Sequence, residues 1–193
     1  MNITEKNVLV IGTQIPWLEA ILHFRNPKLG VTVDFKSRER YKILILYHND
    51  IAPWLFCSEI SNWRFLSTSE FRREALAGTL SFDFIMSYSS VEHSGLGRYE
   101  DSLNPWGDVM ALAEAWCVAS PGARLVLGVP TTLEDFGSVW FNAHRIYGKQ
   151  NYPYLVKVFY NNKIYENWFF KHFLGDKLEI PTRGLGIQIE IFI

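Results

Sequence analysis

The chain has 193 residues, a hydrophobic fraction of 48% and a charged fraction of 20%, so a wholly disordered protein is excluded and one domain can bury a substantial core. Its formal charge of −1 offers no basic excess, so we expect neither nucleic acid nor an anionic membrane surface as a partner. No apolar run approaches the ~20 residues of a membrane span, and no signal-peptide cleavage site follows the N-terminus. We therefore expect a cytoplasmic protein with a small-molecule ligand; the sequence does not indicate its oligomeric state.

The first part of the chain alternates short apolar runs with a helical pattern. Residues 7–12 (NVLVIG) form an apolar run that ends in glycine, which is typical of a strand buried on both faces of a parallel sheet. Pro16 suits a first helical turn, and apolar residues continue at helical spacing as far as Phe24. Residues 30–35 (GVTVDF) predict a second strand that ends in an acid. Residues 42–47 (KILILY) predict a third strand within a stretch that is otherwise irregular.

Regular patterns return at Ser67. Ser67 and Glu70 have the spacing of a capping box, which predicts the start of a helix. Residues 82–87 (FDFIMS) predict the next strand, and a polar, glycine-rich stretch follows it.

Two further segments complete the predicted elements. Residues 108–119 have a helical pattern with Asp108 as the cap, followed by a strand at 124–129. We expect the buried face of this helix to carry Val109, Leu112, Ala113, Trp116 and Cys117. Residues 187–193 (IQIEIFI) alternate with the period of two that is typical of a half-exposed strand.

The order of these elements predicts the fold class. Strands that alternate with helices indicate an α/β fold, a Rossmann-like and mostly parallel sheet with helices on both faces, which is a three-layer sandwich. We expect a single domain over residues 1–193, with its core at 7–148 and a C-terminal extension at 149–193. Cys57 and Cys117 match no metal spacing, and we expect both to be reduced.

Polar groups follow three of the predicted strands at their carboxyl ends, where open α/β sheets bind ligands. They are Gly12 and Thr13 after the first strand, Asp34 at the end of the second, and Ser87, Tyr88, Glu92 and His93 at the end of residues 82–87 and beyond. Because parallel strands end along one edge of the sheet, we expect these residues to surround a common cavity.

Gly12 and Asp34 have the clearest possible roles. A glycine lets a ligand approach the backbone without a Cβ in the way, and the helix that follows offers its positive N-terminus. An acid at the end of the second strand can accept hydrogen bonds from the two hydroxyls of a ribose. The alternatives are structural: Gly12 is a turn residue, and Asp34 pairs with Lys36 or Arg38. Neither residue decides between these alternatives alone.

Three motifs resemble a known family. Residues 82–130, from FDFIMS to LVLGVP, resemble the block from the fourth to the fifth strand of class I S-adenosylmethionine-dependent methyltransferases. SYSSVEHSGLGRYEDSLNPWGD (87–108), FNAHRIYG (141–148) and VLVIGTQIPWLEAIL (8–22) are similar to motifs of domain of unknown function family 268, a methyltransferase-like family. The similarity covers roughly residues 7–35 and 80–148.

The resemblance implies S-adenosylmethionine as the cofactor. Gly12, Thr13 and Asp34 would border this methyl donor, and Ser87, Tyr88 and His93 would lie close to its sulfonium end. Three groups in residues 141–148 suit recognition of a polar substrate: Asn142, His144 and Arg145. Arg98 or Arg145 can clamp a carboxylate or phosphate with two parallel hydrogen bonds. Alternatively, Arg98 pairs with a neighbouring acid and Arg145 braces the loop.

His93 is the candidate general base, with Glu92 beside it as the second catalytic residue. An unperturbed histidine titrates near ~6.5 and can take a proton from an acceptor hydroxyl. Alternatively, the two residues cap a helix or satisfy a local hydrogen bond. No recognised metal spacing occurs, and Gly-x-Ser-x-Gly is absent, so we expect neither a metal site nor a serine nucleophile.

Two functions remain open. The first is a methyltransferase-like enzyme that moves a methyl group from S-adenosylmethionine to a small polar acceptor such as a sugar or glycan. The second is a catalytically inactive Rossmann-like domain that binds a nucleotide-type ligand or a protein partner. The polar loop around His93 favours the first. The sequence VIGTQIPW favours the second, because it holds one glycine where methyltransferases have two or three, and because Trp17 is bulky enough to close the donor site.

Overall fold

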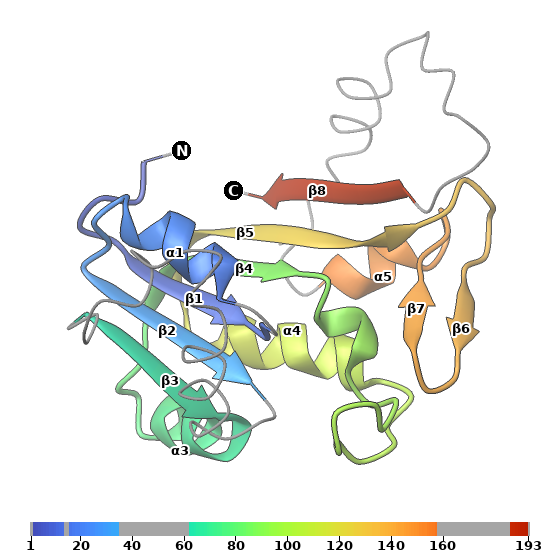
Figure 1. Cartoon of the computed structure of the whole chain (residues 1–193), viewed down its shortest axis with the longest axis horizontal. Helices are drawn as coiled ribbons and strands as arrows, with labels where there is room; N and C mark the ends of the chain where they lie inside the picture. Colours follow the sequence, from blue (N-terminus) through green and yellow to red (C-terminus); the bar gives the residue numbers. More distant parts are fainter. Residues whose placement is uncertain (1, 14–15, 35–61, 158–185, 193) are drawn as a thin grey trace, which may run out of the picture.

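The computed structural model describes residues 2–13, 16–34, 62–157 and 186–192. Within them, the main sheet has six strands in the order β3-β2-β1-β4-β5-β8 (Figure 1). The strand bounds are β1 Asn7–Ile11, β2 Leu29–Asp34, β3 Trp63–Ser67, β4 Phe82–Tyr88, β5 Ala119–Thr131 and β8 Gly186–Phe192. The first five are parallel, and β8 runs antiparallel to β5. A separate antiparallel hairpin pairs β6 (Ser138–Trp140) with β7 (His144–Ile146).

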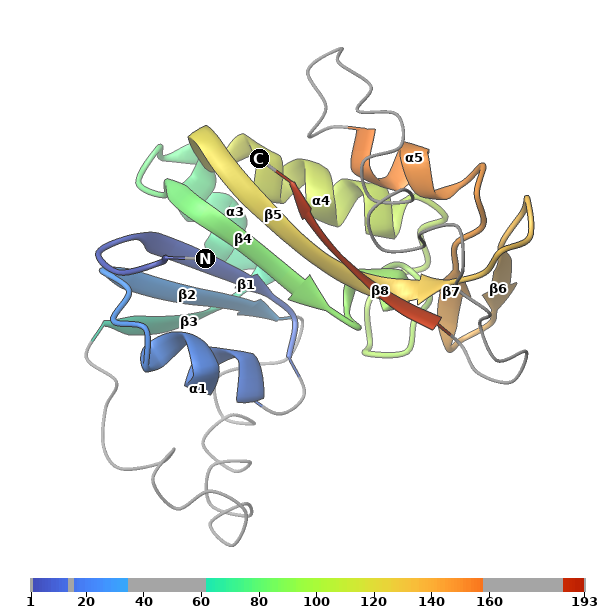
Figure 2. The ribbon, with the colours of Figure 1, turned by 90° about the horizontal axis from the view of Figure 1, so that it is seen from above.

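Helices cover both faces of this sheet, which confirms the predicted three-layer α/β architecture. They are α1 Trp17–His23, α3 Thr68–Leu76, α4 Gly107–Cys117 and α5 Tyr152–Val156, with a short 3₁₀ turn, η2, at Val91–His93. Helix α1 lies on one face, whereas α3, α4 and α5 lie on the other (Figure 2). None of these helices in the described part of the chain has the length and apolar character that a membrane crossing requires.

The apolar strands explain this layering. In β1, Val8 and Val10 belong to the core on the α1 side, together with Leu22 of the helix. Leu9 points to the opposite face, where it joins the larger core that includes Leu112 of α4. Side chains alternate along a strand, so a continuous apolar run serves two cores at once.

The capping box predicted at Ser67 is present. The Ser67 hydroxyl accepts a hydrogen bond from the Glu70 backbone N–H at 3.2 Å, and the Glu70 carboxylate accepts one from the Ser67 backbone N–H at 2.8 Å. This cap starts α3 directly at the end of β3, where the chain turns back over the sheet.

One strand of the main sheet is not predicted from the sequence. The strand next to β2 is β3, at Trp63–Ser67, in the segment that has no clear periodicity. A Cβ on Gly30 would overlap the Trp63 ring, so the glycine of β2 makes room for this tryptophan. The strand predicted at 42–47, like Cys57, lies outside the described residues.

Two expectations for the helix at 108–119 are wrong. Asp108 is not the cap but lies in the first turn of α4, where it is buried and bound by Tyr147. The buried face carries Asp108, Leu112 and Ala115, whereas Trp116 is 46% exposed and Cys117 is an exposed free thiol. The orientation of this helix follows the polar anchor at Asp108, which helical periodicity alone does not reveal.

Candidate functional site

The carboxyl ends of the parallel strands meet at one rim, as expected, and the loop after β4 lies at this rim (Figure 1). The Gly12 N–H donates to the Val33 carbonyl at 2.7 Å, and the Ser87 hydroxyl donates to the Ile11 carbonyl at 3.3 Å. These bonds tie the ends of β1, β2 and β4 together. Gly12 has a φ of 66°, and a Cβ there would overlap the Ser90 hydroxyl, so the glycine lets the loop after β4 approach β1.

A cavity of about 590 Å³ opens at this rim, which is within the range of small-molecule sites of ~300–1,000 Å³. It lies among the ends of β1 and β2, the first turns of α3, helix α4 and the loop 94–106. The lining includes Gly12, Asp34, Thr68, Phe71, Arg72, Ser90, Ser94, Gly95, Tyr99, Glu100, Asp101, Ser102, Asn104 and Glu114.

The charges that line the cavity are mostly negative. Asp34, Glu100, Asp101 and Glu114 face a single cation among the described lining residues, Arg72. The Arg72 guanidinium is bound to Glu114, at 2.8 Å from Nη2 to Oε1. The cavity therefore favours a cationic or neutral polar ligand over a polyphosphate.

His93 and Glu92 lie together behind the cavity wall. His93 Nδ1 is hydrogen-bonded to the Ala143 carbonyl, so Nδ1 carries the proton and leaves Nε2 with a lone pair. Nε2 lies 3.6 Å from Glu92 Oε1, which also accepts a hydrogen bond from the Ser89 hydroxyl at 2.9 Å. Burial lowers the pKa of His93 below 6.5 and raises the pKa of Glu92 above 4.5. Both shifts favour the uncharged form.

Two buried polar atoms beside this pair have no hydrogen-bond partner within the part of the chain that the structure describes. They are Glu92 Oε2 and His144 Nε2. Burial raises the pKa of Glu92, and nearby His144 opposes part of this rise. Buried polar groups normally have hydrogen-bond partners, so each of these two atoms is suited to bind a ligand hydroxyl or a water molecule.

A row of four rings, Tyr99–His93–His144–Trp140, leads from the cavity wall to the surface. Successive ring centroids are 5.5, 6.1 and 5.8 Å apart. Tyr99 lines the cavity, whereas Trp140 is 59% exposed on the β6–β7 hairpin. We call this set the aromatic row.

The structure brings some of the sequence-assigned residues to the cavity and places others behind it. Gly12 and Asp34 line the cavity. Thr13 lies in the loop after β1, and Ser87 is buried at the end of β4. The Tyr88 ring packs edge-on against Trp17 at 5.2 Å, and neither is among the described lining residues, so Trp17 does not plug the cavity.

The residues assigned to substrate binding lie at the β6–β7 hairpin. Asn142 is exposed at its turn, and His144 belongs to the aromatic row. Arg145 is buried and bound to backbone carbonyls of the loop 94–106 and its flanks, as its bracing alternative expects. The roles of all these residues stay predictions.

Sequence reasoning missed much of the cavity wall. Tyr99, Glu100 and Asp101 come from the polar stretch after β4, whose composition indicates ligand recognition without saying which side chains turn inward. Thr68 and Arg72 come from the helix after β3, a strand that the sequence did not reveal. Among the described residues, no group of three or more metal-ligand side chains is arranged to hold a metal ion.

Solved structures with a similar fold include methyltransferases. The 1,6-didemethyltoxoflavin-N1-methyltransferase of Burkholderia thailandensis, solved with 1,6-didemethyltoxoflavin and S-adenosylhomocysteine, matches with a TM-score of 0.55 and 17% identity, over 80% of this chain and 59% of its own. An O-methyltransferase family protein from the same organism has a TM-score of 0.53 and 14% identity, over 80% and 44% of the two chains. The [4+2]-cyclase SpnF has a TM-score of 0.54 and 15% identity, over 80% and 50%. This chain thus spans about half the length of these structures.

The strand order and these likenesses define the fold as that of the class I S-adenosylmethionine-dependent methyltransferases. Residues 5–168 match the family described as Caenorhabditis protein of unknown function, DUF268, and the chain belongs to this family. The resemblance in the sequence motifs is thereby confirmed. No curated protein sequence matches the chain. Because SpnF is a cyclase, the fold alone does not define a reaction.

Proposed function

We propose that the chain binds S-adenosylmethionine in the rim cavity and transfers its methyl group to a small polar acceptor. The observation that carries this proposal is the acidic lining of the cavity, at the carboxyl ends of β1 and β2. When bound, S-adenosylmethionine supplies an electrophilic methyl group on a positively charged sulfonium and leaves as S-adenosylhomocysteine.

The residues of the cavity fit this donor better than a phosphate-bearing nucleotide. Its sulfonium and amino groups are cationic, and the four carboxylates that line the cavity outnumber its one arginine, Arg72, which is bound to one of them, Glu114. Asp34, half-buried at the end of β2, lines the cavity, and a carboxylate at this position can accept hydrogen bonds from ribose hydroxyls. A triphosphate would instead meet like charge.

His93 is the residue that we assign to proton removal from the acceptor, with Glu92 as its neighbour. The bond from Nδ1 to Ala143 fixes the tautomer, and burial keeps the ring neutral, so Nε2 keeps a lone pair that can accept a proton. The ring lies one aromatic layer behind the cavity wall, in contact with Tyr99, so an acceptor would reach it beside that ring.

A sugar or glycan is the acceptor that we propose, because the aromatic row ends in an exposed platform. Trp140 and the neighbouring Phe141 are 59% and 77% exposed. The C–H face of a sugar ring stacks on such rings while its hydroxyls stay free for polar partners, which Asn142 and His144 can provide. Arg145 takes no part in this contact, since its guanidinium is buried.

One observation favours the second function, a catalytically inactive domain. The space beside Gly12 is filled by the Ser90 side chain of the same protein, although a glycine here is expected to admit a ligand. A domain of this kind would keep the fold and bind either a nucleotide-type ligand or a protein partner.

Isothermal titration calorimetry with S-adenosylmethionine and S-adenosylhomocysteine separates the two functions. We expect both ligands to bind the wild type, and Asp34→Ala to weaken binding by about tenfold or more through the loss of the ribose hydrogen bonds. Glu134→Ala is the matched control, because it removes an exposed acid that does not line the cavity, and it should bind as the wild type does. The absence of heat at millimolar ligand would favour the inactive domain. Equal binding by Asp34→Ala and the wild type would show that the donor does not bind at this rim.

A further inference from the structure

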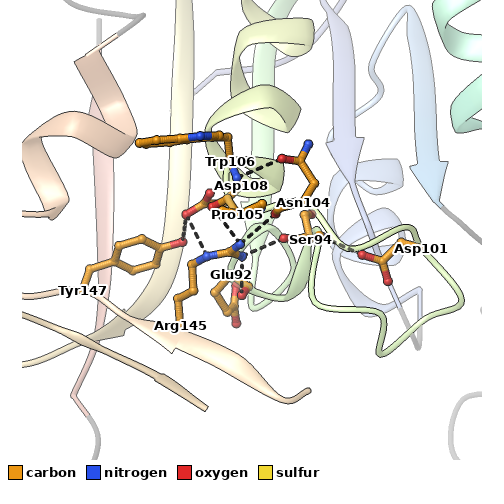
Figure 3. A network of polar contacts seen from close by, with 10 residues as sticks. Glu92, Ser94, Asp101, Asn104, Pro105, Trp106, Asp108, Arg145 and Tyr147 are labelled. Atoms are coloured by element: carbon orange, nitrogen blue, oxygen red, sulfur yellow. Dashed lines mark hydrogen bonds and ion pairs between the residues drawn. The ribbon is translucent and has the colours of Figure 1, made fainter. Parts of the chain in front are cut away.

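One arginine contacts both ends of the loop 94–106. The guanidinium of Arg145 reaches from β7 into the space beside this loop (Figure 3). Its Nη1 donates to the carbonyl oxygens of Glu92 at 3.3 Å and Ser94 at 2.6 Å, where the loop begins. Its Nη2 donates to those of Asn104 at 3.3 Å and Pro105 at 3.2 Å, where the loop ends.

The remaining N–H of the guanidinium faces a buried carboxylate. Arg145 Nε lies 3.5 Å from Asp108 Oδ2, which also accepts a hydrogen bond from the Tyr147 hydroxyl at 2.8 Å (Figure 3). Arg145 is 7% exposed and Asp108 is 5% exposed. A guanidinium has five N–H donors, and here each of them faces an acceptor of the protein itself. No donor is left to clamp a substrate carboxylate or phosphate.

Backbone contacts also hold the two ends of the loop 94–106 together. A Cβ on Gly95 would overlap the Asn104 carbonyl, and one on Gly107 would overlap the Ser94 carbonyl. The Asn104 N–H donates to the Gly95 carbonyl at 2.9 Å, and the Gly95 N–H donates to Asp101 Oδ2 at 2.6 Å. Arg145 therefore binds two ends of a loop that are already in contact with each other.

This loop makes a large part of the cavity wall. Seven of the lining residues belong to it: Ser94, Gly95, Tyr99, Glu100, Asp101, Ser102 and Asn104. We propose that Arg145 is a positioning residue, which fixes both ends of the loop and so sets the affinity of the cavity for its ligand without touching that ligand. We call the contacts of Arg145 with both ends of the loop the clamp. The effect on ligand affinity rests on the proposed donor site, whereas the clamp does not.

The variant Arg145→Lys tests the clamp, because lysine keeps the charge but cannot direct paired donors to carbonyls on two sides. In hydrogen–deuterium exchange, we expect the amides of Gly95, Asn104 and Gly107 to exchange at least about tenfold faster than in the wild type, since local opening costs less free energy. Leu22→Ala is the matched control, because it destabilises the core on the other face of the sheet. In Leu22→Ala, we expect these three amides to stay as well protected, compared with the amides of the sheet, as they are in the wild type.

Ligand binding supplies the second measurement. With S-adenosylhomocysteine as the probe, we expect Arg145→Lys to raise the Kd by about tenfold, and Leu22→Ala to leave it unchanged under conditions where both variants are folded. Guanidinium chloride at non-denaturing concentration should restore part of the affinity of Arg145→Ala, whereas the same ionic strength of sodium chloride should not. General loss of stability would not produce this rescue.

Each result has a defined meaning. If the amides of Arg145→Lys exchange at wild-type rates, Arg145 does not hold the ends of the loop. If they exchange faster but the Kd is unchanged, Arg145 holds the loop without affecting ligand affinity. Absence of binding by the wild-type chain would contradict the proposed donor site. The exchange rates would still show whether Arg145 holds the two ends of the loop.

Discussion

At the scale of single residues, Glu19 is a fully buried carboxyl group. It lies on α1 with 1% of its surface exposed, and its Oε1 accepts a hydrogen bond from the Thr32 hydroxyl at 2.9 Å. Burial raises the pKa of this carboxyl from 4.5 to about 7, and nearby Asp34 acts in the same direction. The folded chain thus binds this proton more tightly than the unfolded chain. The resulting stabilisation is complete below about pH 4.5 and is lost as pH rises through about 7.

Glu19→Gln should remove this dependence on pH, because a glutamine does not titrate. Relative to the variant, we expect the free energy of unfolding of the wild type to fall by about 3 kcal/mol between roughly pH 4 and pH 8. Urea denaturation of both proteins across this range measures the difference. Glu134→Gln should track the wild type, and parallel curves for wild type and Glu19→Gln would show that the pKa of Glu19 is the same in the folded and the unfolded chain.

His93 provides a second test at this scale, now on turnover. With S-adenosylmethionine and methyl glycosides, we expect His93→Ala to slow formation of S-adenosylhomocysteine by ~10²–10⁴-fold while donor affinity stays the same. The wild-type rate should decline only as pH falls below 6.5, because burial lowers the pKa of His93 and the neutral ring is the active form. His23→Ala, an exposed histidine on α1, is the control. Full turnover by His93→Ala would remove the base assignment.

At the scale of elements, the cap of α3 links stability to the site. The capping box at Ser67 starts the helix whose first turns carry Thr68, Phe71 and Arg72 into the cavity wall. Ser67→Ala should lower the free energy of unfolding by ~1 kcal/mol, because a helix N–H loses its acceptor. Chemical denaturation measures this loss. Ser138→Ala in the exposed β6 should cost less than half of it, and equal losses would show that the cap contributes nothing specific.

Local patterns predict the elements whose determinants are local. The apolar runs at β1, β2 and β4 and the capping box at Ser67 predict their elements almost to the residue. The strand β3 escapes prediction because Trp63 is accommodated by a glycine of another strand, Gly30. The face of α4 is mispredicted because a buried acid, Asp108, points inward against β7. Both misses come from contacts between segments far apart in the sequence.

At the scale of the whole molecule, the topology gathers residues that the sequence keeps apart. Gly12 and Asp34 are predicted at one rim from the rule for parallel strands, and both line the cavity. The inward-facing residues of the loop 94–106 are not predictable in the same way, because the ends of the loop are bound by Arg145, some forty to fifty residues further along. The division into a core at 7–148 and an extension at 149–193 stays a prediction.

The charge of the cavity is also a property of the whole molecule. Its acids come from β2, α4 and the loop 94–106, while the net charge of the chain is only −1. Composition therefore conceals the feature that supports a cationic ligand, since charges that cancel over the chain are separated in space.

A crystal structure of the chain with millimolar S-adenosylhomocysteine would show directly whether this acidic rim cavity is a donor site. We expect ligand density within the cavity, with the ribose at Asp34 and the loop 94–106 packed against the ligand. Density at another place on the molecule, or a rim closed by the protein's own side chains at saturating ligand, would contradict the proposed donor site.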